Sequence, residues 1–179
     1  MIHTLLSYIR IVLPFIYMAG TWRFGDWRNW KKYYPTILFI ISVDFFISIL
    51  MYESPLWTIQ GSLLIPNHTI ADFFMVFLSF SQMVLIYLSN YPYKSKWYRQ
   101  FIYVGLWALL YILIEIIFMY AKLISYQNGW NIWWSMLVWI FMFIGLRLHH
   151  TKPLWAWLLC FVCTTFLIIY FHIPITKLR

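Results

Sequence analysis

Six apolar runs decide what this chain can fold into, because each is about 18 residues or longer, enough to cross ~30 Å of hydrocarbon as a helix. Very little sequence remains between the runs, so no separate soluble domain is expected. We predict an all-α transmembrane bundle of about six spans, forming a single integral membrane domain over residues 1–179. The predicted spans are Ile2–Thr21, Tyr34–Tyr52, Thr69–Leu88, Gln100–Ala121, Asn131–Leu148 and Leu154–Phe171.

Composition supports this interpretation and argues against a soluble protein. The chain is 64% hydrophobic and only 10% charged, whereas soluble domains carry about 25% charged residues. Aromatic residues make up 23% of the chain and include 12 Trp. Many of them flank the apolar runs, as Trp and Tyr do at the headgroup level of a bilayer. The lipid bilayer is therefore the first predicted partner.

The first run is the least typical of a transmembrane helix, because it contains Arg10 and Pro14. It has no basic segment ahead of its apolar stretch and no clear small-residue cleavage site, so a signal peptide is not expected. It is either a tilted span or a helix that lies in the membrane interface. Five spans plus one interfacial segment is the alternative architecture.

The basic residues predict how the spans are oriented. The net charge is +8, but Lys and Arg lie in short connections and form no continuous basic face, so nucleic acid is not an expected partner. The odd-numbered connections carry nine of them, and the even-numbered connections with the C-terminal tail carry three. Because Lys and Arg favour the cytoplasmic side, we expect a multi-pass cell-membrane protein with its N-terminus outside.

Three acidic residues, Asp44, Asp72 and Glu115, fall inside predicted spans. A carboxylate at the centre of a bilayer costs roughly 2.5–3.5 kcal/mol on insertion scales, so such residues face the bundle interior, pair, or line a path. With the orientation above, all three lie in the outer half of the membrane. We therefore predict that they share one site, open to the outside.

Helical periodicity adds three further residues to this predicted site. His68, Asp72 and Gln82 lie on one polar stripe of the third run. On the fourth run, one face holds Glu115 together with Ala108, Tyr111 and Lys122. The alternative is structural: neutral acids that hydrogen-bond between helices. The predicted ligand- or ion-binding residues are Asp44, Asp72, Glu115, His68, Gln82 and Tyr111.

We predict no metal and no cofactor. One His with two or three carboxylates could form an oxygen-rich metal site, but a histidine at a helix end is more often interfacial. Cys160 and Cys163 have C-x-x-C spacing, yet they lie within an apolar run and lack the further ligands of a zinc site. Packing is the expected role of both cysteines.

A short stretch carries a resemblance to a known family. Residues Ile114–Asn131 hold Glu115 and a polar loop that ends in Gly129 and Trp130. Together with Trp27, Trp30, Asp44 and Asp72, this stretch resembles an uncharacterised family of small multi-pass membrane proteins from spore-forming Gram-positive bacteria. The resemblance covers roughly residues 15–148. It implies a five-span core in a bacterial plasma membrane, with one extra span at the C-terminal end and no implied substrate or reaction.

Three classes of function follow. The first is transport or binding of a small ligand, a cation or a proton at the carboxylate-lined site. The second is a scaffold or accessory subunit of a membrane complex, as a homo-oligomer or with another membrane protein. The third is an intramembrane hydrolase, lipid-active or metal-assisted. No short catalytic motif is found, which argues against an enzyme.

Overall fold

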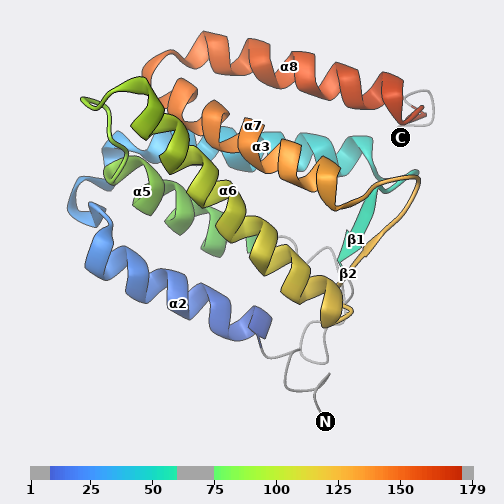
Figure 1. Ribbon diagram of the computed structural model, residues 1–179, viewed down its shortest axis with the longest axis horizontal. Coiled ribbons are helices and arrows are strands. Elements are labelled where there is room, and N and C mark those ends of the chain that lie inside the picture. Colours follow the sequence, from blue (N-terminus) through green and yellow to red (C-terminus); the bar gives the residue numbers. More distant parts are fainter. Residues whose placement is uncertain (1–8, 60–74, 175–179) are drawn as a thin grey trace.

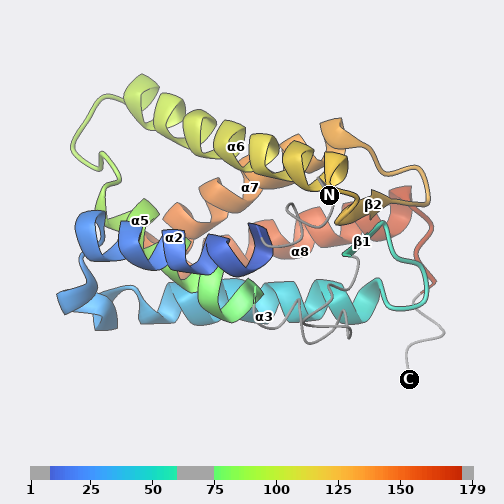
Figure 2. The ribbon, with the colours of Figure 1, turned by 90° about the horizontal axis from the view of Figure 1, so that it is seen from below.

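The computed structural model describes residues 9–59 and 75–174 and places their helices side by side in a bundle (Figures 1 and 2). The helices are α2 (Ile9–Phe24), η1 (Trp27–Lys32), α3 (Tyr34–Leu50), η2 (Met75–Phe80), α5 (Ser81–Ser89), α6 (Trp97–Tyr120), α7 (Ile132–Thr151) and α8 (Pro153–Tyr170). In this bundle, α6 crosses α3 and α8 obliquely (Figures 1 and 2). Two short strands complete the described part, β1 (Trp57–Ile59) and β2 (Ile124–Tyr126).

Within the described residues, three helices are long and apolar enough to cross a membrane: α6 with 24 residues, α7 with 20 and α8 with 18. They agree with three of the six predicted spans. The second predicted span is the shorter apolar helix α3, of 17 residues. The first and third spans lie partly outside the described residues, so the predicted count of six stays a prediction.

The connections divide the bundle into two unlike ends (Figure 1). We call one the basic end. It contains the α2–α3, α5–α6 and α7–α8 connections, and nine Lys and Arg residues lie in or beside them. We call the other the capped end. It contains β1, β2 and the first turns of α2 and α7, and its Lys and Arg residues within the described ranges are Arg10 and Lys122.

The capped end is closed by a two-stranded antiparallel sheet. Trp57, Thr58 and Ile59 of β1 pair with Tyr126, Ser125 and Ile124 of β2. The pairing ties the chain after α3 to the chain after α6. Strands of three residues are too short to show a periodic pattern, so the sequence did not predict them.

The turn that leads from α6 into β2 has a clear physical cause. Lys122 adopts a left-handed backbone conformation, with φ of 56°. The Leu123 N–H then donates to the Phe118 carbonyl at 2.8 Å, and the side chains of both residues pack together. This is the Schellman arrangement. It removes Lys122 from the helix face on which Glu115 lies.

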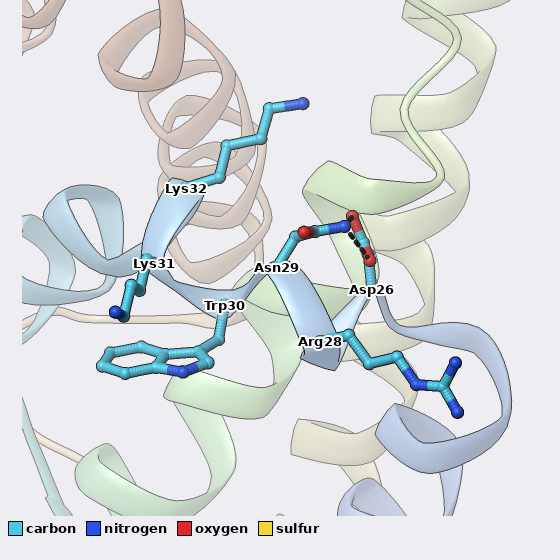
Figure 3. A pocket seen from close by; sticks show the side chains of 6 residues that line it. All are labelled: Asp26, Arg28, Asn29, Trp30, Lys31 and Lys32. Atoms are coloured by element: carbon cyan, nitrogen blue, oxygen red, sulfur yellow. Dashed lines mark hydrogen bonds between the residues drawn. The ribbon is translucent and has the colours of Figure 1, made fainter.

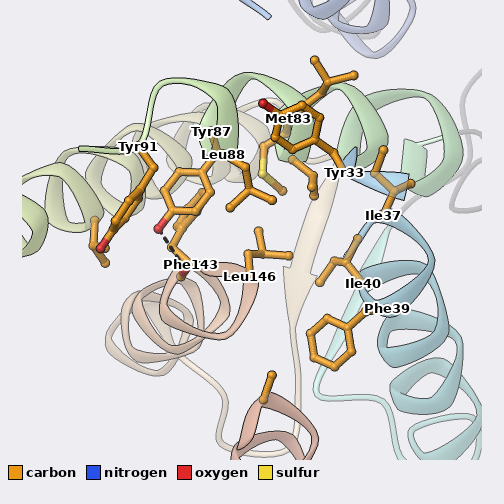
Figure 4. Packing of buried hydrophobic residues seen from close by; sticks show 14 of the residues in the cluster. Tyr33, Ile37, Phe39, Ile40, Met83, Tyr87, Leu88, Tyr91, Phe143 and Leu146 are labelled. Atoms are coloured by element: carbon orange, nitrogen blue, oxygen red, sulfur yellow. Dashed lines mark hydrogen bonds between the residues drawn. The ribbon is translucent and has the colours of Figure 1, made fainter. Parts of the chain in front are cut away.

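The main core lies between α3, α5, α6 and α7, and large aromatic side chains fill it (Figure 4). Tyr87 is fully buried, and its hydroxyl donates to the Phe143 carbonyl at 2.9 Å. The Tyr103 hydroxyl in turn donates to the Tyr87 carbonyl at 3.0 Å. Interhelical hydrogen bonds of this kind hold helices together where hydrocarbon offers no hydrophobic driving force.

Candidate functional site

The carboxylate of Glu115 lies at the centre of a hydrogen-bond network near the capped end. Its Oε1 accepts from the Tyr126 hydroxyl at 2.7 Å and from the Ser135 hydroxyl at 2.6 Å. Its Oε2 accepts from the Trp139 indole N–H at 2.6 Å. An indole N–H is a donor only, so Oε2 acts as an acceptor. One side chain thereby joins α6, β2 and α7.

Ser135 is the second centre of this network. It is buried, and besides donating to Glu115 it accepts from the Trp130 indole N–H at 2.9 Å. The Tyr126 hydroxyl also lies 3.3 Å from the Ser135 oxygen. Ser135 is therefore placed in the first turn of α7 with partners for both its donor and its acceptor capacity. Its position on α7 follows from the cap at Asn131, whose side chain accepts from two backbone N–H groups of that turn.

Tyr126 lies in β2, outside the long helices, and burial raises the pKa of its phenol above the ordinary value. The hydrogen bond with Ser135 lowers that pKa, while the hydrogen bond and the charge of Glu115 raise it. The phenol is therefore protonated at neutral pH. It is fixed as a hydrogen-bond donor toward Glu115.

Aromatic rings continue the site from Glu115 into the bundle. The Trp139 ring lies 4.5 Å from the Tyr111 ring and 6.3 Å from the Phe80 ring, centroid to centroid. Tyr111 is buried, and its hydroxyl accepts from the Tyr17 hydroxyl at 2.6 Å. Tyr17 thus connects α2 to α6 in the interior. Tyr111 was among the predicted site residues, whereas Tyr17 and Trp139 were not.

Three interior oxygen atoms have no hydrogen-bond partner within the described part of the chain: Thr21 Oγ1, Ser79 Oγ and Gln82 Oε1. Ser79 lies in η2, which is a π-helical turn, and Gln82 follows it in α5. Such turns are frequent at functional sites, and buried polar atoms of proteins usually contact another polar group, a water or an ion. Gln82 therefore remains a candidate ligand-binding residue.

The prediction that Asp44, Asp72 and Glu115 share one site cannot be followed for all three residues, because only Asp44 and Glu115 lie within the described part of the chain. Asp44 is half-buried on α3 and has interactions of its own. Asp72 and His68 lie outside the described residues, so the shared site stays a prediction. Within residues 9–59 and 75–174, no group of three or more His, Cys, Asp or Glu side chains could hold a metal ion.

Comparison with known protein families, with curated proteins and with solved structures finds no match for this chain. The resemblance to small membrane proteins of spore-forming bacteria therefore stays a prediction.

The sequence indicates only some of the residues that surround Glu115. Ser135 follows Asn131 by one helical turn, which marks a polar face at the start of α7. Neither Tyr126, in a loop, nor Trp139, within the fifth apolar run, stands out in a chain with 12 Trp and 14 Tyr. The α6–β2 turn sets the position of the Tyr126 hydroxyl, and no local pattern encodes that position.

Proposed function

We propose that the chain is a multi-pass membrane protein with six crossings, in which α2, α3 and the η2–α5 segment accompany the three long helices. Figures 1 and 2 support this, because these segments lie alongside α6, α7 and α8. The described apolar lengths of α3 and α5 are short for ~30 Å. Residues before Met75 would lengthen the η2–α5 segment, and local thinning of the bilayer would accommodate α3.

The orientation that we propose places the basic end in the cytoplasm and the capped end outside. Nine Lys and Arg residues at one end, against Arg10 and Lys122 at the other within the described ranges, match the distribution that positions helices during insertion. The N-terminus is then outside, and Glu115 lies in the outer half of the membrane.

We further propose that the protein binds, or passes across the membrane, a cation or a small cationic ligand, with a proton as the smallest case. One observation carries this proposal: the three described partners of Glu115 are a phenol, a hydroxyl and an indole, all of them neutral. These donors stabilise the carboxylate, but none of its described hydrogen-bond partners carries a positive charge. A cation or a proton would neutralise the net charge that remains.

The bundle interior also offers groups that suit a cation better than an anion. Next to Glu115 lie the aromatic rings of Trp139 and Tyr111, and aromatic ring faces attract cations. Elsewhere in the interior, the buried atoms without described partners on Ser79 and Gln82 are oxygens, which can accept from an ammonium group. The proposed occupant is therefore a monovalent cation or an organic ammonium ion.

A second candidate function is that of a subunit in a membrane complex, and α8 favours it. Only 11% of its apolar window is buried within the chain. Among its exposed side chains, Leu154 is 81% and Ile169 67% accessible. Such a face contacts either lipid or another membrane protein. In this case the hydrogen bonds of Glu115 would serve only to fasten α6 to α7.

The two candidates are separated by replacing Glu115 with Gln. In E115Q the amide oxygen can accept from Trp139, while the amide N–H groups donate to the oxygens of Tyr126 and Ser135, whose hydroxyls can reverse their roles. The variant thus removes the charge and keeps the number of hydrogen bonds. The matched control W139F keeps the charge and the aromatic packing but removes one hydrogen bond.

Thermal unfolding of the purified protein would be measured with sodium, potassium and tetramethylammonium chloride at constant ionic strength. A bound cation raises the unfolding temperature in proportion to the logarithm of its concentration above Kd. We expect this increase in the wild type and W139F, and its loss in E115Q. Proton passage would be followed with a pH-sensitive dye in proteoliposomes. A wild type that responds to no cation and passes no protons would contradict the proposal and favour the subunit role.

A further inference from the structure

The basic end gathers three basic side chains from two distant segments around two tyrosine rings. Lys32 ends η1, while Arg147 and His150 lie near the end of α7. The Lys32 Nζ lies 5.6 Å from the centroid of the Tyr33 ring, and the His150 ring stacks on that same ring at 5.5 Å. The His150 ring and the Arg147 guanidinium lie 6.0 and 5.9 Å from the Tyr93 ring.

These groups are close enough to act on one another through their charges. Both Lys32 and Arg147 exert a Coulombic effect on the His150 imidazole. Like charges held close together disfavour one another. An anion bound between them would relieve this repulsion.

The acidic residue that belongs to this end, within the described ranges, is already engaged. Asp26 accepts from the Asn29 side-chain amide at 2.9 and 3.1 Å through its two oxygens. It also accepts from the Tyr33 hydroxyl at 3.3 Å. Asp26 therefore lies on the hydroxyl side of Tyr33 and orients the ring on which His150 stacks. Its carboxylate makes no described ion pair with Lys32, Arg147 or His150.

The donors at this end are also underused. Arg147 donates one side-chain hydrogen bond in the described part of the chain, from Nη1 to Thr151 at 2.9 Å, although a guanidinium carries five donor N–H groups. Burial raises the pKa of Tyr93 to about 12, even though the charge of Arg147 lowers it. The Tyr93 phenol is thus protonated at neutral pH and is a further donor.

We propose that Lys32, Arg147 and His150 bind the phosphate group of an anionic phospholipid headgroup. A planar guanidinium pairs with two phosphate oxygens, and the Lys ammonium and the imidazole N–H add further donors. The depth fits a lipid. Trp30 and Tyr34, which pack edge to face at 5.4 Å at the same end of the bundle, are residue types that favour the headgroup level. Basic pockets between transmembrane helices bind anionic headgroups in this way.

A neighbouring hollow provides the internal comparison. A cavity of about 400 Å³ lies along η1, and its lining includes Arg28, Lys31 and Lys32. Figure 3 shows Lys31 beside Trp30 on one side of η1 and Lys32 on the other. The basic groups of this cavity diverge, and the cavity is open. Lys31 is therefore a matched control for Lys32, because it has the same charge and lies on the same helix, while its side chain points to the other side of η1.

The test measures lipid binding to the full-length protein in detergent by native mass spectrometry. Phosphatidylglycerol, which has an anionic headgroup, would be titrated against phosphatidylcholine, which is zwitterionic. The double variant K32Q/R147Q would be compared with K31Q/K94Q, which removes the same charge from exposed positions of the same end. We expect the first pair to lose about tenfold in affinity for phosphatidylglycerol, equivalent to one charge-assisted hydrogen bond. The control pair should lose less than about twofold.

Three outcomes would overturn the proposal. An equal loss of phosphatidylglycerol affinity in the two double variants would show that the lipid is attracted by the overall positive charge of the basic end and not by a specific site. Equal binding of both lipids by the wild type would exclude recognition of an anion. Glycerol 1-phosphate binding as tightly as phosphatidylglycerol would assign the site to a soluble phosphate. Should R147Q lower the unfolding temperature severely, K32Q against K31Q decides the matter alone, because both residues are exposed, with about a fivefold loss expected for K32Q only.

Discussion

The two ends of the bundle differ in how their polar side chains are stabilised beside hydrocarbon. At the capped end, Glu115 is surrounded by neutral donors, and the connections are tied to one another by the β1–β2 pair. At the basic end, Arg147 and His150 lie among aromatic rings, and within the described residues few side-chain hydrogen bonds restrain them. At the capped end, the polar groups are satisfied by hydrogen bonds within the chain. At the basic end, the basic groups remain available to the anionic partner that we propose.

This difference teaches where each kind of interaction can be placed. Hydrogen bonds between neutral groups and a carboxylate are short-ranged and need fixed geometry, so they are found where strands and helix caps fix the backbone. Clustered positive charges need a mobile counter-charge, and lipid headgroups provide one on the membrane surface. Substitutions at the capped end should therefore act by disturbing hydrogen-bond geometry. Substitutions at the basic end should act by removing positive charge.

The largest expected effect is an all-or-none difference in accessibility. In a C160A/C163A background, Q127C at the capped end and K94C at the basic end carry single exposed cysteines. We expect a membrane-impermeant maleimide to label Q127C in intact cells and K94C only after permeabilisation. Labelling of both from one side would show that the two ends do not lie on opposite faces of the membrane.

The next largest effect concerns Ser135. S135A removes the donor to Glu115 and leaves the buried Trp130 indole N–H without its acceptor. A buried polar group left unpaired costs about 1–3 kcal/mol, so we expect a loss of about 2 kcal/mol in the free energy of unfolding. The control at the basic end is T151A, whose exposed hydroxyl accepts from Arg147. Its loss should be below about 0.5 kcal/mol, and equal losses would contradict the contrast.

A smaller effect is expected at Gly129, in the turn before α7. Its φ of +83° lies in the left-handed region, and no atom lies within 4 Å of the position that a Cβ would take. G129A should therefore destabilise the protein through the backbone alone, by roughly 1–2 kcal/mol. G105A on α6 also has open space, but at a helical φ, and should be neutral or slightly stabilising. Chemical denaturation of both variants gives the comparison.

The smallest effect is expected for Y126F. It removes one of the two donors to Glu115 Oε1 and leaves Ser135 in place. Interhelical hydrogen bonds in membrane proteins average ~0.6 kcal/mol, so the loss in the free energy of unfolding should be about 1 kcal/mol or less. The control is Y52F, an exposed tyrosine at the same end. A larger loss for Y126F than for S135A would move the centre of the network from Ser135 to Tyr126.

The long helices could be predicted from the sequence because hydrocarbon thickness sets their length. The predicted span Gln100–Ala121 corresponds to α6, Trp97–Tyr120, and the predicted span Asn131–Leu148 to α7, Ile132–Thr151. The bounds differ by a few residues at most, because helix ends depend on capping geometry that apolar periodicity does not show.

The predicted face of the fourth span was useful in part. Ala108 and Tyr111, which share that face with Glu115, are buried. Lys122, placed on the same face, was wrong, because the helix ends before it and the backbone turns left-handed there. Helical periodicity therefore predicts which residues share a face within a helix, but it fails beyond the turn that ends the helix.

The partners of Glu115 and the basic cluster could not be predicted for a common reason. Each depends on where a turn directs a side chain that is distant in sequence, such as Tyr126 toward Glu115 or Tyr33 toward His150. In a chain so rich in aromatic residues, composition does not distinguish those that form a site from those that contact lipid.

His149 shows the same limit at the basic end. From the sequence, a histidine that follows Arg147 at the end of a predicted span is expected to be interfacial. Its ring stacks on Phe39 at 4.3 Å, and its Nδ1 lies 3.1 Å from the Thr36 hydroxyl. The side chain therefore joins α7 to α3, a contact that depends on how the two helices pack.

The join between α7 and α8 has a consequence for how the protein is made. Lys152 is the one residue between them, and Pro153 already begins α8. Two helices joined so tightly are expected to enter the bilayer together, as one antiparallel hairpin. A change that stops α8 from entering should therefore disturb the placement of α7, and with it the Ser135 and Trp139 donors of Glu115.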